Sequence, residues 1–180
     1  MKTAALLLVA LPLFSFAQSP APAAGAALKA EVDPLASAVY DAVNTREAKR
    51  VSVLVRRPPV GFAAKHGAEL NGSFHGRHAR LVVLSRTDAG PHAAEFYFVD
   101  GVLRFVYETA EFFEDGSVDT GWKNFKGFRA WERRIWFAVD GHAHAEANGA
   151  FPGEASTPTD LWNEAGALHR LLQARLDPAN

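Results

Sequence analysis

Two histidines and a glutamate alternate with alanines in the C-terminal part of the sequence. They are His142, His144 and Glu146. Because successive side chains of a β-strand point to opposite faces, an extended chain places all three on one face. Two imidazoles and a carboxylate are ligands that zinc and iron accept. The segment is therefore a candidate metal site. The favoured interpretation is a polar strand face without metal, because this is the commoner origin of so short a motif.

Basic and aromatic side chains interleave over residues 122–136. This segment holds five basic residues and one acidic residue, Glu132. Aromatic rings beside cations can stack on sugars or bases and can hold anionic groups. If the protein has a face that binds a ligand or partner, we expect it to contain Trp122, Lys123, Lys126, Arg129 and Trp131.

A structural role for the same segment is the alternative. Residues 108–119, which precede it, carry five acidic residues and no basic residue. The two segments can neutralise each other across a sheet while the aromatic rings enter the core. Charge runs usually do no more than solvate a face, which favours this interpretation.

Recognisable catalytic signatures are missing from the sequence. It contains no Gly-x-Ser-x-Gly, no His-Glu-x-x-His, no phosphate-binding loop and no Gly-x-Gly-x-x-Gly. Neighbouring acids such as Glu111 and Glu114 would suit glycoside cleavage only at the right separation, which adjacency does not establish. We therefore expect a protein without catalytic activity, and no cofactor other than the metal ion considered above.

The first seventeen residues resemble a secretory signal peptide. They combine Lys2, an apolar run over residues 4–11 and the small-x-small ending Ser15-Phe16-Ala17. The apolar run is too short to span a bilayer. We expect cleavage near Ala17 and a bacterial protein that works in the periplasm or the medium. Residues 18–30, rich in Pro, Ala and Gly, are predicted to form a flexible leader.

The remaining residues, 31–180, have the size of one domain. The 180-residue sequence contains no cysteine, so its core must rely on packing instead of disulfides. A net charge of −1 gives no reason to expect a nucleic acid or a membrane surface as partner. A second long apolar segment is missing, which argues against a membrane span after cleavage.

Hydrophobic periodicity predicts helices at both ends of this domain and strands between them. The first helix should begin at Asp33-Pro34 and end near Arg46, and the last should begin at Thr157-Pro158. Residues 61–76 give only a weak pattern. Alternating apolar residues predict strands over residues 50–56, 78–85, 94–99 and 102–108.

Asp100-Gly101 stands between two alternating apolar runs and predicts a tight β-hairpin. With a two-residue turn, Tyr97 and Arg104 face each other and make a cation–π contact. The other face of the hairpin then enters the core with Phe96, Phe98, Leu103 and Phe105.

A second hairpin is predicted at Asp140-Gly141, between strands over residues 129–139 and 142–146. The expected fold is therefore α+β: an antiparallel β-meander with these two hairpins, packed against an N-terminal and a C-terminal helix. We expect both helices to cover the same face of the sheet.

Three functions remain compatible with these features. The first is a non-enzymatic exported binding module for a protein, a peptide or a glycan of the cell envelope. The second is a metal-binding protein or metal-dependent enzyme that uses His142, His144 and Glu146. The third is a structural component of the envelope that binds no ligand.

Overall fold

The computed structural model describes residues 22–55, 67–87, 90–113, 128–151 and 155–176. Along the chain, one helix precedes the seven strands and a second helix follows them. The elements are α1 (Pro22–Val43), β1 (Lys49–Val55), β2 (Ala68–His75), β3 (His78–Thr87), β4 (Gly90–Val99), β5 (Val102–Phe113), β6 (Phe128–Phe137), β7 (Ala143–Asn148) and α2 (Pro158–Leu176).

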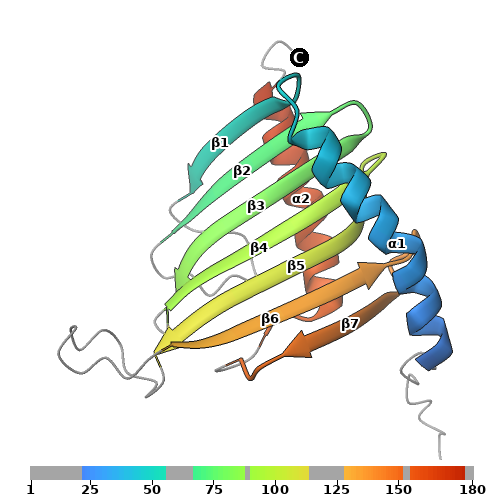
Figure 1. Cartoon of the computed structure of the whole chain (residues 1–180). Helices are drawn as coiled ribbons and strands as arrows, with labels where there is room; N and C mark the ends of the chain where they lie inside the picture. The colour runs from blue at the N-terminus through green and yellow to red at the C-terminus, as the bar shows by residue number, and fades with distance from the viewer. Residues whose placement is uncertain (1–21, 56–66, 88–89, 114–127, 152–154, 177–180) are drawn as a thin grey trace, which may run out of the picture.

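The seven strands form one antiparallel sheet, in which each strand pairs with the next one along the chain (Figure 1). This confirms the predicted α+β fold with its meander and two terminal helices. β2 is the strand that the weak pattern of residues 61–76 concealed. Its central residue on the α2 side is Gly72, where a Cβ atom would lie 2.7 Å from the Phe74 ring and 3.2 Å from Leu172.

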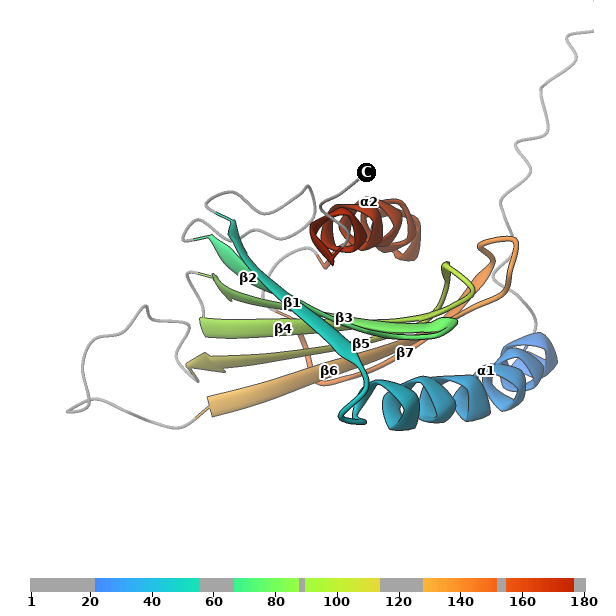
Figure 2. The same ribbon diagram turned by 90° about the horizontal axis from the view of Figure 1, so that it is seen from above.

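The two helices lie on opposite faces of the sheet, so the expectation that they share one face is wrong (Figure 2). The reason is that the strands are apolar on both sides. Under α1, a small cluster joins Val39 and Val43 to Tyr97 and Val99. Under α2, the main core includes Leu70, Leu81, Phe96, Phe98, Ile135, Phe137, Leu161, Leu168 and Leu172.

Helix α1 begins at Pro22, so the predicted start at Asp33-Pro34 is wrong. Residues 22–30, expected to belong to a flexible leader, form the first part of this helix. Asp33 does not cap a helix; its carboxylate accepts a hydrogen bond of 2.6 Å from the indole nitrogen of Trp136. Lys29 adds an ion pair of 3.0 Å to Glu146 on β7. These contacts hold an alanine-rich segment of high helix propensity against the sheet.

The β4–β5 hairpin has the predicted two-residue turn. Asp100 and Gly101 have φ angles of 52° and 76°, as a turn with two left-handed residues requires. Beyond the turn, the register shifts between Tyr97 and Phe98, which leaves Arg104 as an additional residue on β5. Such an extra residue is a β-bulge.

The bulge corrects the predicted faces of this hairpin. Tyr97 pairs with Phe105 instead of Arg104, and Phe105 packs with the α1 cluster instead of the main core. Phe96, Phe98 and Leu103 keep their predicted place in the core. Arg104 is 7 % exposed and donates hydrogen bonds to the Phe137 carbonyl and the Glu31 carboxylate.

The second hairpin and the last helix also form where they were predicted. β6 and β7 pair from Phe137 opposite Ala143, with Asp140-Gly141 inside the connecting loop. Thr157 caps α2: its hydroxyl accepts a bond of 3.1 Å from the Asp160 N–H, and Asp160 accepts one of 3.2 Å from the Thr157 N–H. This reciprocal pair satisfies donors at the start of the helix.

Candidate functional site

The predicted metal ligands have other partners in the structure. His142 lies in the loop, 3.3 Å from Asp140. His144 stacks on Trp136 and lies 3.3 Å from Glu146, which in turn pairs with Lys29. Among the described residues, no group of three or more metal-ligating side chains lies close enough together to hold an ion. His144 and Glu146 instead attach α1 to the last strand.

The predicted basic and aromatic face is placed only in part. Trp122, Lys123 and Lys126 lie outside the described residues, and Arg129 is described only by its backbone position in β6. Trp131 is 5 % exposed and packs against His92 and Phe151, so it does not present an exposed ring. For Trp131, the structural alternative considered from the sequence fits better than a binding role.

A buried polar cluster lies under α2. Glu108 on β5 accepts a hydrogen bond of 2.7 Å from Nε of Arg133 on β6, and its other oxygen lies 3.7 Å from Nε2 of His92. The Glu108–Arg133 ion pair joins an acidic residue of segment 108–119 to a basic residue of segment 122–136 on the neighbouring strand. This is the charge neutralisation that the structural interpretation of these segments expected. Glu164 of α2 is buried on the same side of the sheet, and neither of its carboxyl oxygens has a hydrogen-bond partner among the described residues.

Burial controls the protonation of this cluster. It raises the pKa of Glu164 to about 8, with help from the negative charges of Glu108 and Asp160. It lowers the pKa of His92 to about 4, with help from the Arg133 cation. At neutral pH, Glu164 and His92 are therefore both uncharged, while Glu108 and Arg133 form an ion pair. The cluster therefore contains one internal ion pair, between Glu108 and Arg133, beside two groups that are uncharged at neutral pH.

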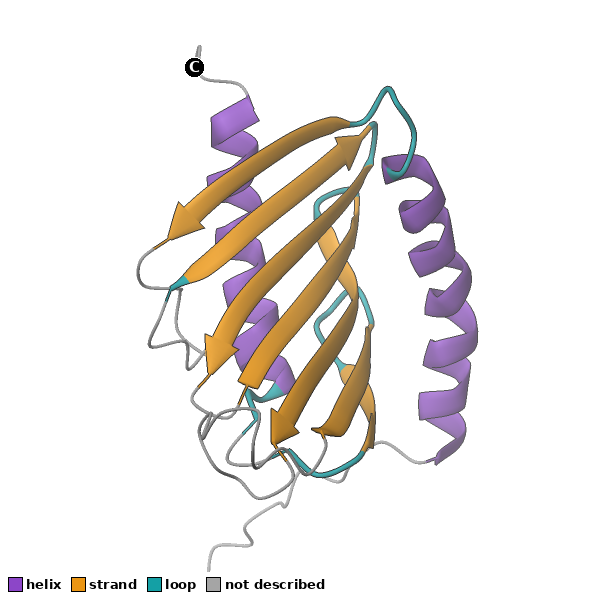
Figure 3. Ribbon diagram, turned by 60° about the vertical axis from the view of Figure 1, so that its left-hand side comes forward, coloured by secondary structure: helices purple, strands orange, loops and turns teal. Residues whose placement is uncertain are grey.

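The opposite face of the sheet carries the more accessible polar and aromatic groups. α1 crosses this face beside the turns that join β2 to β3, β4 to β5 and β6 to β7 (Figures 1 and 3). No other described element covers the remainder of the face. A row of register partners runs across the strands beneath α1: Arg80, Tyr97, Phe105, Trp136 and His144.

Two tyrosine–glutamate–arginine triads occupy this face. In the first, Tyr97 donates a bond of 2.6 Å to Glu95, and Arg80 donates two bonds of 2.8 and 3.0 Å to the same oxygen. The Arg80 guanidinium also lies over the Tyr97 ring, 5.8 Å from its centre. Burial and the Glu95 carboxylate raise the pKa of the Tyr97 hydroxyl, which keeps it a neutral donor.

The second triad has the same composition on neighbouring strands. Tyr107 of β5 donates a bond of 3.0 Å to Glu132 of β6. Arg134 lies 3.4 Å from Glu132, with its guanidinium 5.6 Å from the Tyr107 ring centre. Since Glu95 is the register partner of Tyr107, the two triads are adjacent across β4 and β5.

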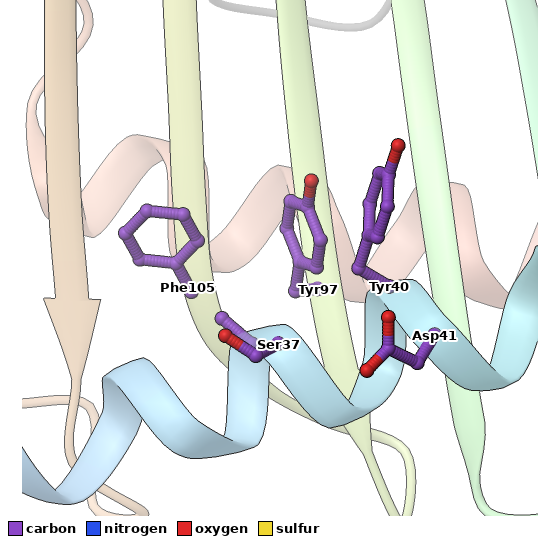
Figure 4. A pocket seen from close by; sticks show the side chains of 6 residues that line it. Ser37, Tyr40, Asp41, Tyr97 and Phe105 are labelled. Carbon is purple, nitrogen blue, oxygen red and sulfur yellow. The ribbon is translucent and has the colours of Figure 1, made fainter.

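A pocket of about 290 Å³ opens between α1 and the first triad (Figure 4). Its walls are aromatic: Tyr97 and Phe105 come from the sheet, and Tyr40 comes from α1. Ser37 and Asp41 line its helix side. The remaining lining residue is Ala36, so each turn of this part of α1 contributes to the pocket.

Comparison of the chain with protein-family models, with curated proteins and with solved structures found no match. Neither described helix is long and apolar enough to cross a membrane. The site must therefore be interpreted from its own residues.

Sequence reasoning missed this face, although part of its signal is present. Tyr97 and Tyr107 each stand at an outward position of an alternating strand, and a polar partner lies two residues from Tyr97 at Glu95. Alternation places such residues on one face. The contribution of Tyr40 and Asp41 has no such signal, because it depends on where α1 crosses the sheet.

Proposed function

We propose that the protein is a non-enzymatic exported binding module and that its ligand face is the α1 side of the sheet. The observation that carries this proposal is the pocket beside α1, where three aromatic rings lie next to polar side chains of the helix. Ligand sites commonly combine aromatic walls with a few placed polar groups. The ligand is a component of the cell envelope, either a peptide or a glycan.

The surroundings of the pocket suit recognition of a polar ligand. The hydrogen bonds of the first triad hold Arg80, Glu95 and Tyr97 in fixed orientations before any ligand arrives, which lowers the entropy lost on binding. Tyr40 is 50 % exposed, so its ring is accessible at the pocket rim. Tyrosine supplies a large contact area with few rotatable bonds, and is frequent where proteins recognise ligands.

The test is a binding experiment on arrays of bacterial glycans and of random peptides, probed with the labelled chain. We expect saturable binding that Tyr40→Ala weakens at least fivefold. The matched control is Val139→Ala, which truncates an exposed side chain in the β6–β7 loop and should leave binding unchanged. Absence of saturable binding on both arrays, or equal binding by wild type and Tyr40→Ala, would contradict the proposal.

A further inference from the structure

We infer that the pocket beside α1 binds a protonated alkyl amine, such as the end of a lysine side chain or of a small diamine. This inference rests on the proposed function and specifies the chemistry of the ligand. It follows from four properties of the pocket: the charge of Asp41, the three rings, the size, and the limited number of polar groups.

Asp41 supplies the negative charge. It is exposed on α1, lines the pocket, and has neither a hydrogen bond nor an ion pair with any other described residue. The nearby Arg80 guanidinium is already bound to Glu95. The net charge of Asp41, Arg80 and Glu95 together is therefore −1, which favours a cationic ligand.

The three rings add a second preference for a cation. The face of an aromatic ring attracts cations through its quadrupole, and rings grouped around one position are a known way to bind ammonium groups. Tyr40 and Tyr97 already show this preference, because the Arg80 guanidinium lies 5.4 Å from the Tyr40 ring centre and 5.8 Å from that of Tyr97. Arg80 is not among the residues that line the pocket; of the two tyrosines, Tyr40 is 50 % exposed and Tyr97 is 7 % exposed, so Tyr40 offers the more accessible ring.

Size and polarity distinguish an alkyl amine from a sugar. A volume of about 290 Å³ is at the lower end for ligand pockets and suits one side chain or one small molecule. The polar groups on the helix side of the pocket are the Ser37 hydroxyl and the Asp41 carboxylate, whereas the tyrosine hydroxyls point away from them (Figure 4) and that of Tyr97 is bonded to Glu95. An ammonium group with three donors can use the first two, while its carbon chain packs on Phe105 and Tyr97. A sugar ring would leave several hydroxyls without partners.

The experiment is an NMR titration of the full chain with three probes: N-acetyl-lysine amide, its neutral analogue N-acetyl-norleucine amide, and 1,4-diaminobutane. We expect saturable shifts at the amides of Ser37, Tyr97 and Phe105 with both amines, and an affinity for the lysine probe at least fivefold above that for the norleucine probe. Comparison of the lysine and diamine probes shows whether the amine comes from a peptide or from a small molecule.

Asp41→Asn keeps the shape of the side chain and removes its charge. We expect it to weaken the binding of the lysine probe about tenfold and to leave the norleucine probe unchanged. The matched control is Glu111→Gln, which removes one exposed carboxylate six residues from Phe105 along β5, about 20 Å away. It should have little effect, because charges at that distance are screened.

Two results would overturn the inference: equal affinity for the lysine and norleucine probes, or unchanged lysine affinity in Asp41→Asn. Two variants of Tyr40 test the contribution of its ring. Tyr40→Phe keeps the ring and should retain binding of the lysine probe, whereas Tyr40→Ala should lose it. If array ligands bind through Tyr40 without preferring an amine, the proposed function stands and the inference fails. If no array ligand binds, the proposed function fails, whatever the amine titration shows.

Discussion

Glu164 of α2 and Glu108 of β5 are two buried carboxyl groups on the same side of the sheet, and among the described residues only Glu108 is paired with a cation. Arg133 neutralises Glu108, whereas neither oxygen of Glu164 has a hydrogen-bond partner among the described residues. The negative charge of Glu108 adds to the effect of burial and raises the pKa of Glu164 to about 8. The helix is therefore held on the sheet most firmly while Glu164 carries its proton.

This arrangement predicts that the stability of the protein falls as the pH rises from about 6.5 to about 8. Glu164 loses its proton near pH 4.5 in the unfolded chain and near pH 8 in the folded protein. Between these values the folded state binds more protons, so the free energy of unfolding decreases with pH. One such group contributes a slope of up to about 1.4 kcal/mol per pH unit. Urea denaturation at half-unit pH steps measures it.

His92 has the opposite effect at lower pH. Its pKa is about 4 in the folded protein and 6.5 when unfolded, so its contribution to stability increases with pH over that interval. The two slopes oppose each other below pH 6.5, and the decrease due to Glu164 remains above it. Glu164→Gln should remove the decrease and raise stability at pH 8. If Glu164→Gln shows the same decrease in stability with pH as the wild type, the decrease is due to another group.

A second prediction concerns Gly25 in α1. Replacement of a helical glycine by alanine usually stabilises a protein by roughly 0.5–1 kcal/mol. Here the new Cβ atom would lie 2.6 Å from Nδ1 of His144, whose ring is stacked on Trp136. We expect Gly25→Ala to destabilise the protein instead, by about 1 kcal/mol, because the ring must leave its stack.

The double variant with His144→Ala provides the control for this contact. In that background the space is open, and Gly25→Ala should regain its ordinary stabilising effect. Chemical denaturation of the four proteins in the cycle gives the coupling between the two positions. A stabilising effect of Gly25→Ala in the wild-type background would show that α1 does not approach β7 so closely.

A third prediction compares two phenylalanines of the β4–β5 hairpin. Phe98 is 1 % exposed in the main core, so Phe98→Ala should cost about 3–5 kcal/mol of unfolding free energy. Phe105 is only partly buried, beside α1, so Phe105→Ala should cost roughly 1–2 kcal/mol. Denaturation curves of both variants test the order. Equal losses would indicate that Phe105 belongs to the main core and would contradict the bulge at Arg104.

A fourth prediction concerns the N-terminal residues that resemble a signal peptide. If the chain is exported, N-terminal sequencing of the protein from the periplasm or medium should begin at or near Gln18. Substitution of Ala17 by a large charged residue should block this cleavage, because the site requires small residues. Recovery of the intact Met1 terminus from the cytosol would contradict export.

Local signals in the sequence were sufficient for several elements. Asp100-Gly101 is a pair suited to two left-handed residues, and both φ angles are positive in the structure. Thr157-Pro158 predicted the start of α2, where Thr157 and Asp160 exchange hydrogen bonds. These features depend on residues within a few positions of one another, so they can be inferred before any tertiary contact is known.

Other features were decided only by tertiary contacts. The start of α1 could not be inferred because it is held by partners such as Trp136, 103 residues from Asp33 in the chain. Arg104, the additional residue of the bulge, is bonded to the distant Glu31 and Phe137, and the bulge reverses the predicted face of Phe105. The candidate pocket arises in the same way: Tyr40 and Asp41 reach Tyr97 only because α1 crosses the sheet there. Alternation along a strand determines which residues share a face. A β-bulge or a helix distant in the sequence determines which face that is and what packs against it.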